Sequence, residues 1–389
     1  MNIQQRYPSV AYLEDKARNR VPPFVWDYLV GGGVRGSAVE RNHAAFSHLT
    51  LTPKYILNSQ IIPNISQQLL DTKFDAPFGV APIGLNGLIW PNSSEFLSKA
   101  AKKANIPFIL SLYATSRLED IIEYGGIQNT WFQHYPQHSR DINLQIIKRA
   151  RVAGYKTLVI TIDVPTTRIP RNIRNGLSLP IQLRPKVFLD MLCKPRWTTK
   201  TLIAGPPTFE NWLPHMPKSY KKRDMWKFLQ TLPILPHQIT REKLSWFRDN
   251  WTDNLIVKGV LHNSDAQMCK ELGIDAMVIS NHGGRQLDEA PSAIETLSSI
   301  RSEVGSGFPL LVDGGIRTGG EIALALAHGA DFVLLGRAFM FALAALGGQG
   351  AAHAIAILQD ELRSTMIQLG CPLLSELPET ITNTKSSTS

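Results

Sequence analysis

The feature that most constrains this fold is a regular recurrence of short apolar segments along the chain. Eight segments are predicted to be buried strands, and they begin about 22–33 residues apart except across one long gap. They cover residues 78–84, 107–112, 130–135, 157–164, 254–260, 276–282, 309–315 and 332–337. Helical patterns lie between several of them, at 94–104, 141–153, 264–272 and 320–328. Eight strand–helix units predict an α/β fold of the (β/α)8 TIM-barrel type, with a doubly wound sheet as the alternative.

Two segments fall outside this repeat and are predicted to be additions to the barrel. Residues 1–70 favour a helical extension, with Phe24, Trp26 and Tyr28 on one helix, glycines at 31–33, and a second helix near 37–46. Residues 1–380 are therefore expected to form a single barrel domain. The polar residues 381–389 are predicted to be a disordered tail.

The long gap predicts an insertion, 177–253, after the fourth strand. Between Arg184 and Arg248 the chain has thirteen Lys/Arg and four Asp/Glu, which accounts for the whole net charge of +9. A patch this local argues against a nucleic-acid-binding protein. The insertion also contains tryptophans at 197, 212, 226 and 246. Two interpretations stay open: contact with an anionic membrane surface, or a solvated lid whose tryptophans pack on the barrel wall.

Cysteine usage and hydropathy indicate the compartment. The three cysteines, at 193, 269 and 371, are far apart and form no disulfide framework, which favours a reducing compartment. The N-terminal residues lack the apolar core of a signal peptide, and glycines interrupt the most apolar stretch, 338–358. We therefore expect a cytoplasmic protein, with peripheral attachment to the cytoplasmic face of the inner membrane if the insertion binds lipid.

The stretch AMVISNHGGRQLDE at 276–289 is the first candidate for chemistry. His282 and Arg285 come just after a buried strand, and in a barrel all such strand ends meet at one mouth. His carries protons near neutral pH, and Arg binds carboxylates in a bidentate manner. The other strand ends contribute Pro82, Ile83, Gly84, Ser111, Gln133, Tyr135, Thr161, Asp163, Lys258, Ser280, Asp313, Gly314, Gly315, Arg317, Gly336 and Arg337.

The last two strand ends predict a phosphate site. Each is rich in glycine and carries an arginine, and backbone N–H groups at such ends receive anions. The polar residues of the other strand ends suit a flat heteroaromatic ring, so the sequence predicts bound flavin mononucleotide (FMN). The sequence has neither a GxGxxG after a first strand nor a Walker loop, and no HExxH or Cys/His cluster predicts a metal.

These motifs together resemble the FMN-dependent α-hydroxy acid dehydrogenase/oxidase family, over residues 12–371. The matching motifs are WDYLVGGG at 26–33, WFQHY at 131–135, VKG at 257–259, SNHGGRQLD at 280–288, DGGIRTG at 313–319 and LLGR at 334–337. Within the family the chain is most similar to the membrane-associated mandelate dehydrogenases, with the lactate dehydrogenases next. That similarity depends on APIGLNGLIWP at 81–91, KPRW at 194–197 and WFRDNW at 246–251.

The resemblance implies oxidation of a small 2-hydroxy acid to a 2-keto acid. His282 would be the base, Asp163 would stabilise its imidazolium, and Lys258 would lie beside the flavin. Substrate binding would fall to Tyr28, Tyr135, Arg168, Arg285 and His282. Gly84 favours a dehydrogenase that passes electrons to a quinone or another membrane acceptor, and the family implies a homotetramer.

One stretch departs from the family pattern. The loop after Asp163 is one residue short, which puts Ile169 where the family has a substrate-binding Arg. Arg168 or Arg171 could replace it if the loop is redrawn around Pro170. Ile83 also stands where a hydroxyl is common. Two further functions therefore stay open: an oxidase that uses O2 and produces H2O2, and an FMN-binding protein with changed or lost activity.

Overall fold

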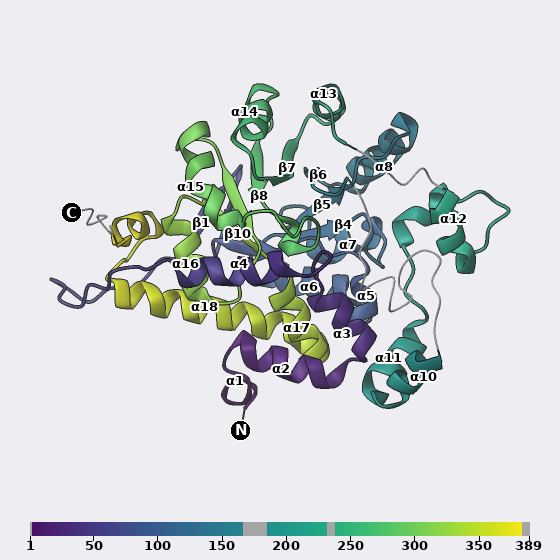
Figure 1. Ribbon diagram of the computed structural model, residues 1–389, viewed down its shortest axis with the longest axis horizontal. Coiled ribbons are helices and arrows are strands. Elements are labelled where there is room, and N and C mark those ends of the chain that lie inside the picture. The colour runs from purple at the N-terminus through teal and green to yellow at the C-terminus, as the bar shows by residue number, and fades with distance from the viewer. Residues whose placement is uncertain (1, 166–184, 232–237, 383–389) are drawn as a thin grey trace.

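Eight parallel strands close into a barrel in the computed structural model, which describes residues 2–165, 185–231 and 238–382 (Figure 1). Each strand pairs with the next along the chain, and the last pairs with the first, in the order β10-β3-β4-β5-β6-β7-β8-β9. This closure confirms the predicted barrel and excludes the doubly wound sheet. The strands are β3 (Phe78–Val80), β4 (Phe108–Ser111), β5 (Thr130–His134), β6 (Thr157–Thr161), β7 (Asn254–Val260), β8 (Ala276–Ile279), β9 (Leu310–Asp313) and β10 (Phe332–Leu335).

Helices cover the outside of the barrel. Two begin at clear sequence signals: Ser139 accepts a hydrogen bond from the backbone N–H of Ile142, and Thr318 forms a capping box with Glu321. The covering helices are α6 (Ser93–Lys103), α7 (Leu118–Gly125), α8 (Arg140–Ala153), α13 (Arg241–Asn250), α14 (Asn263–Glu271), α15 (Ala293–Val304), α16 (Gly319–Ala327), α17 (Arg337–Leu346) and α18 (Gly350–Leu369). The four helical stretches predicted between strands are confirmed within one residue at each end.

The barrel interior explains why the polar side chains gather at one end. Successive residues of a strand point to opposite faces. The buried inner cluster includes Ile109, Trp131, Val159, Ile256 and Leu311. Two residues further along the same strands come Ser111, Gln133, Thr161, Lys258 and Asp313. Strand alternation therefore makes a polar layer at the carboxyl ends of the strands, above an apolar filling.

A short antiparallel hairpin that the sequence did not predict packs against this filling. It consists of β1 (Gln67–Leu69) and β2 (Thr72–Phe74). Phe74 is fully buried, and its ring centroid lies 6.3 Å from that of Trp131 and 5.7 Å from that of Phe332. Because these rings belong to the inner cluster, the hairpin closes the barrel at the end opposite the polar layer.

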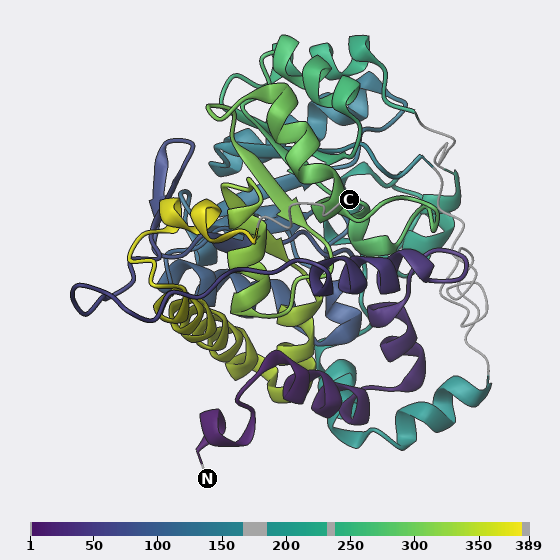
Figure 2. The ribbon, with the colours of Figure 1, turned by 60° about the vertical axis from the view of Figure 1, so that its left-hand side comes forward.

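The predicted N-terminal extension is helical. It consists of α1 (Ile3–Arg6), α2 (Val10–Arg20), α3 (Pro23–Val30) and α4 (Ser37–Ser47), and α2 packs along α17 (Figures 1 and 2). Gly33 donates its N–H to the carbonyl of Gly284, 3.0 Å away, and a Cβ on Gly33 would lie 2.5 Å from the carbonyl oxygen of Gln286. The glycine run thus lets the chain lie directly on the SNHGGRQ loop.

The region of the predicted insertion has two parts with different surroundings. The helices α10 (Pro185–Leu192) and α11 (Pro195–Ala204) form a pair at the periphery (Figure 1). The 3-10 helices η1 (Glu210–His215) and η2 (Lys222–Asp224), with α12 (Met225–Thr231), lie closer to the barrel mouth. The last helix of the range, α13, covers the barrel, with Phe247 and Trp251 fully buried.

The tryptophans of this region face the protein more than the solvent. Trp197 and Trp212 are buried, while Trp226 and Trp246 are half-buried. The Trp197 indole donates to the carbonyls of Leu88 and Ile89 on α5 (Asn86–Ile89). For Trp197 and Trp212 this geometry agrees with the lid interpretation, in which tryptophans pack on the barrel.

The C-terminal residues correct one expectation. The predicted disordered tail begins at 381, but Ile381 bridges to Leu51, and Thr382 donates its N–H to the carbonyl of Thr50. Residues 383–389 lie outside the described residues. In the described part of the chain, Arg337–Leu369 is the one helical stretch long and apolar enough to cross a membrane. It consists of α17, the 3-10 helix η4 (Gly347–Gln349) and α18, and α17 and α18 pack against α2 and α16 as core helices.

Candidate active site

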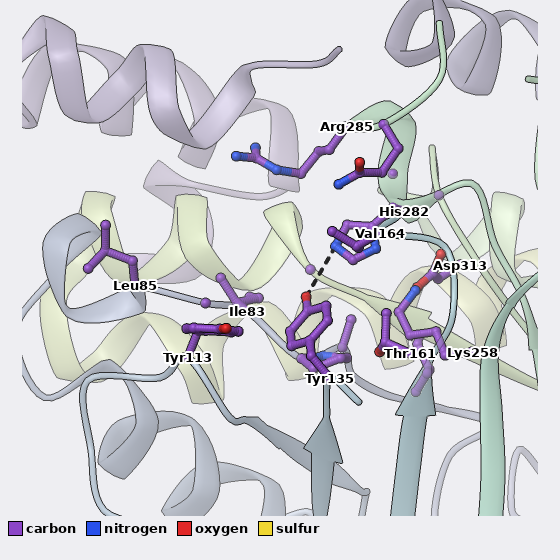
Figure 3. Close-up of a pocket in the computed structure, with 18 of the residues that line it drawn as sticks. Ile83, Leu85, Tyr113, Tyr135, Thr161, Val164, Lys258, His282, Arg285 and Asp313 are labelled. Carbon is purple, nitrogen blue, oxygen red and sulfur yellow. Dashed lines mark hydrogen bonds and ion pairs between the residues drawn. The ribbon is translucent and has the colours of Figure 1, made fainter. Parts of the chain in front are cut away.

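A cavity of about 390 Å³ opens at the carboxyl end of the barrel. Most of the predicted site residues line it: Tyr28, Pro82, Ile83, Gly84, Tyr135, Thr161, Lys258, His282, Arg285, Asp313, Gly314, Gly315, Arg317, Gly336 and Arg337. In Figure 3, Tyr135 rises from its strand toward His282, and Arg285 extends above the cavity. The strand ends therefore meet around one space, as the sequence predicted, and the N-terminal helix α3 reaches the same space through Tyr28.

His282 holds an unusual backbone conformation at the rim of this cavity. It begins the 3-10 turn η3 (His282–Gly284) with φ at +58°, a backbone region that residues other than glycine rarely occupy. Its N–H donates to the hydroxyl of Ser280, and the Asn281 side chain accepts from the N–H of Gly284. Asn281 also exchanges two amide hydrogen bonds with Asn42. These hydrogen bonds hold the turn in place and so maintain the strained backbone conformation of His282.

The imidazole of His282 lies between a carboxylate and a phenol. Its Nδ1 is 2.8 Å from Asp163 Oδ1, and its Nε2 is 3.4 Å from the Tyr135 hydroxyl (Figure 3). Burial raises the pKa of Asp163, but the charge and hydrogen bond of His282, with Lys258 further away, lower it overall. Asp163 is thus an anion at neutral pH. The arrangement can take up a proton at Nε2, since the resulting cation would face Asp163.

The phenols beside His282 stay protonated. Burial raises the pKa of both Tyr28 and Tyr135, and for Tyr135 the negative charge of Asp163 raises it further. The Tyr28 hydroxyl donates to the carbonyl of Gly84 at 2.9 Å. Arg285 donates to the carbonyls of Tyr28 and Gly31 and lies over the Tyr28 ring at 5.0 Å. The phenols and guanidinium are therefore donors fixed at the cavity wall.

A buried ion pair lies deeper in the cavity. Lys258 Nζ is 2.5 Å from Asp313 Oδ2 and 2.6 Å from the Ser280 hydroxyl, which donates to Asp313 Oδ1. Three other predicted residues form a second polar row. Ser111 donates to Gln133 Oε1 at 2.9 Å, and Gln133 Nε2 donates to the Thr161 hydroxyl at 2.8 Å. Thr161 lines the cavity, whereas Ser111, Gln133 and Ser280 are not among its lining residues. Gln133 and Ser280 hydrogen-bond to residues that do line it, Thr161 and Lys258.

The glycine-rich ends of β9 and β10 fit an anionic group. Gly314 and Gly315 have φ of +102° and +87°, and a Cβ on Gly315 would lie 2.3 Å from the carbonyl of Asn42. Burial lowers the pKa of Arg317, while burial and the charges of Arg285 and Arg317 lower that of Arg337. Guanidinium groups crowded in this way are stabilised by an anion between them. These arginines and glycines would hold the phosphate of FMN, and Thr161 and Lys258, which line the cavity, would hold its ring.

The predicted and the observed residues of this site differ at a few positions. Arg168, predicted to bind substrate, lies outside the described residues, as does the short loop around it. Sequence reasoning missed Tyr113, Phe209, Trp226 and Ile239, which also line the cavity. The last three belong to the insertion, and no motif signalled that they return to the mouth. Among the described residues there is no group of three or more His, Cys, Asp or Glu that could hold a metal.

Comparisons with known proteins agree with this geometry. Residues 17–384 match the model of the FMN-dependent dehydrogenase family. The (S)-mandelate dehydrogenase of Pseudomonas putida is 35% identical over 94% of this chain and 93% of its own length. The 2-hydroxyacid oxidase 2 of Bos taurus is 32% identical over 94% and 95%. A crystal structure of the monotopic membrane protein (S)-mandelate dehydrogenase is similar with a TM-score of 0.89 and 34% identity, covering 96% of this chain and 99% of that one.

Proposed function

Because this chain belongs to the FMN-dependent dehydrogenase family, we propose that it oxidises a 2-hydroxy acid to the 2-keto acid with His282 as the base. FMN would accept the two electrons removed from the substrate. The observation that carries the proposal is the Asp163–His282–Tyr135 row beside the cavity. His282 Nδ1 lies 2.8 Å from the Asp163 carboxylate, and Nε2 lies on the side of the Tyr135 hydroxyl, 3.4 Å away.

His282 would take a proton from the substrate at Nε2. Asp163 is ionised and buried, so it would stabilise the imidazolium that forms and would hold the tautomer with the proton on Nδ1. The Tyr135 hydroxyl, protonated at working pH, would donate to the substrate hydroxyl oxygen. These roles require a neutral histidine and an anionic aspartate before reaction.

Arg285 and Tyr28 would bind the substrate carboxylate. The guanidinium lies over the Tyr28 ring, and both side chains line the cavity on the side of His282. A carboxylate there would face an arginine and a neutral phenol donor. We propose that this pair suffices to bind the substrate carboxylate.

We also propose that the electrons leave to a quinone or a similar membrane acceptor. Gly84 supports this through the resemblance to the family, in which a glycine at this position favours a dehydrogenase. A Cβ here would make only ordinary contacts, the nearest at 3.4 Å to Tyr113 Cβ, so packing alone does not require the glycine. The similarity to a 2-hydroxyacid oxidase favours O2 as the second candidate acceptor. Hydrogen peroxide formed in proportion to turnover would decide for the oxidase.

The direct test is the visible spectrum of the FMN-loaded protein under anaerobic conditions. We expect (S)-mandelate or L-lactate to bleach the flavin band, and we expect His282→Gln to keep the band but lose the bleaching. Bound flavin that no 2-hydroxy acid bleaches would refute the proposed activity and favour an FMN-binding protein of other function. Protein that does not bind FMN would contradict the cofactor assignment itself.

We further propose that the helix pair α10–α11 docks on an anionic membrane surface. Its side chains Phe188, Leu192 and Ile203 are 55%, 73% and 82% exposed, although all three are apolar. Cationic side chains flank them: Lys186, Arg196 and Lys200 on the same two helices, and Lys194 between the helices. Apolar side chains beside cations suit the boundary between acyl chains and anionic headgroups. The similar crystal structure is described as a monotopic membrane protein.

Vesicle flotation tests this docking. We expect the FMN-loaded protein to float with phosphatidylglycerol vesicles, and the triple variant Phe188→Ser, Leu192→Ser, Ile203→Ser to stay in solution with its flavin spectrum unchanged. The control replaces exposed apolar side chains of other elements, Ile127, Val152 and Ile367, by serine. Equal loss of flotation in both variants would contradict a specific role for α10–α11.

A further inference from the structure

The cavity continues past the polar residues into an apolar wall that the proposed function does not use. Beyond Tyr28, Tyr135, His282 and Arg285, its lining includes six apolar or aromatic residues: Leu85, Tyr113, Val164, Phe209, Trp226 and Ile239. Figure 3 shows Leu85, Ile83 and Tyr113 to one side of the Tyr135–His282 contact. A substrate bound at His282 and Arg285 would direct its side chain toward this space.

Three aromatic contacts connect this wall to the base. The ring centroid of Tyr113 lies 5.3 Å from that of Tyr135 and 5.4 Å from that of Phe209, which meets it edge-on. Phe209 in turn lies 4.9 Å from Trp226. Since the Tyr135 hydroxyl is 3.4 Å from His282 Nε2, the wall begins beside the proposed base and leads away from it.

The wall is held in place by a buried asparagine. Asn211, on η1, accepts from the N–H of Leu118 at 2.8 Å, and its amide donates to the carbonyls of Leu112 and Ser116. Those residues flank Tyr113 in the chain. Asn211 is fully buried, and so is Trp212, whose ring lies 5.9 Å from that of Tyr113. The insertion is therefore bonded to the loop that carries Tyr113, which fixes Phe209 against it.

The chemistry of the wall is apolar. Burial raises the pKa of Tyr113 to about 12, and Gln137 hydrogen-bonds its hydroxyl, so the ring presents an uncharged face. Phe209, Trp226 and Ile239 add no charge. A methyl group, as in lactate, would fill little of this space, whereas an aryl or branched alkyl group would displace water from it.

We propose that the substrate carries a large apolar side chain, aryl or branched alkyl, and that Phe209 and Trp226 of the insertion select it. This inference rests on the proposed oxidation of a 2-hydroxy acid. One more methylene in an apolar pocket changes specificity by about 10- to 200-fold. We therefore expect at least a tenfold preference for larger side chains over the methyl of L-lactate.

The experiment measures anaerobic flavin reduction in the FMN-loaded protein by four acids: L-lactate, (S)-2-hydroxyisocaproate, (S)-mandelate and L-3-phenyllactate. For each acid we compare the ratio of the flavin-reduction rate constant to the dissociation constant, and we expect this ratio to be lowest for lactate. Phe209→Ala and Trp226→Ala should each lower the ratio about tenfold for the larger acids. For lactate the ratio should stay within twofold of that of the parent chain. Trp246→Ala is the matched control, because Trp246 lies in the same region of the chain but does not line this cavity.

A binding measurement without turnover separates the two proposals. The dissociation constants of 3-phenylpropionate and propionate are read from the perturbation of the flavin spectrum, for the parent chain and for both variants. Tighter binding of 3-phenylpropionate that falls in Phe209→Ala supports the wall even if no acid is oxidised, in which case only the proposed activity fails. Equal binding of the two acids, or equal reduction rates by lactate and phenyllactate, would overturn the inference. Phe209→Leu and Trp226→Leu, which keep an apolar side chain, serve if the alanine variants do not fold.

Discussion

Replacing Asp163 by asparagine would test whether His282 becomes a cation during the reaction. Asparagine keeps the shape and can still accept a hydrogen bond from Nδ1, 2.8 Å away, but it removes the charge. Both side chains are largely buried, at 12% and 18% exposed for Asp163 and His282, so solvent screens the pair weakly. A hydrogen bond to a charged group contributes about 1.5–3 kcal/mol. Flavin reduction should therefore slow by about 10- to 150-fold, since 1.36 kcal/mol is a factor of ten.

The assay is stopped-flow reduction of the FMN-loaded variant at saturating 2-hydroxy acid. The FMN content and the melting temperature should stay close to those of the parent chain. A second variant, Gly259→Ala, displaces the same carboxylate by steric contact. A Cβ on Gly259, where φ is +107°, would lie 2.5 Å from Asp163 Cγ. Gly259→Ala should displace Asp163 and also slow reduction, with some loss of stability. A reduction rate within threefold of the parent in Asp163→Asn would refute the role of the imidazolium.

Three further perturbations have expected outcomes that follow from the geometry. Phe74→Ala should lower the free energy of unfolding by about 3–5 kcal/mol in urea titrations, because it leaves a cavity in a filled barrel end. Burial lowers the pKa of His134 to about 4. The free energy of unfolding should therefore be highest above pH 6.5 and fall by up to about 3 kcal/mol as the pH drops toward 4, because the unfolded chain binds the proton more readily. His134→Gln should flatten this pH dependence in melting curves. Gly315→Ala should abolish FMN retention on a desalting column, because its Cβ would meet Asn42 at 2.3 Å.

The fold could be predicted because one pattern repeats eight times. Strands that are buried on both faces appear as continuous apolar runs, and the interval between them leaves room for one helix. The hairpin β1–β2 escaped prediction because Gln67–Leu69 and Thr72–Phe74 are three residues each and mostly polar. Only the closed barrel makes a place for Phe74, so its burial is a tertiary effect that no local pattern carries.

The polar part of the site could be predicted for a similar reason. Its residues follow strands, and strand ends share one edge of a barrel. Phe209 and Trp226 could not be placed, because a side chain in an insertion is positioned by contacts distant in sequence, here through Asn211 and residues 112–118. The conformation of His282, with φ at +58°, was equally hidden, since a turn with glycines on one side allows many backbones.

The hairpin at the amino end also has a kinetic consequence. Phe74 packs among Trp131 and Phe332 in the filled barrel interior, and the cavity opens at the other end. Substrate and keto acid would therefore enter and leave through the same opening. A keto acid that dissociates slowly would keep the next substrate out, so product would compete with substrate.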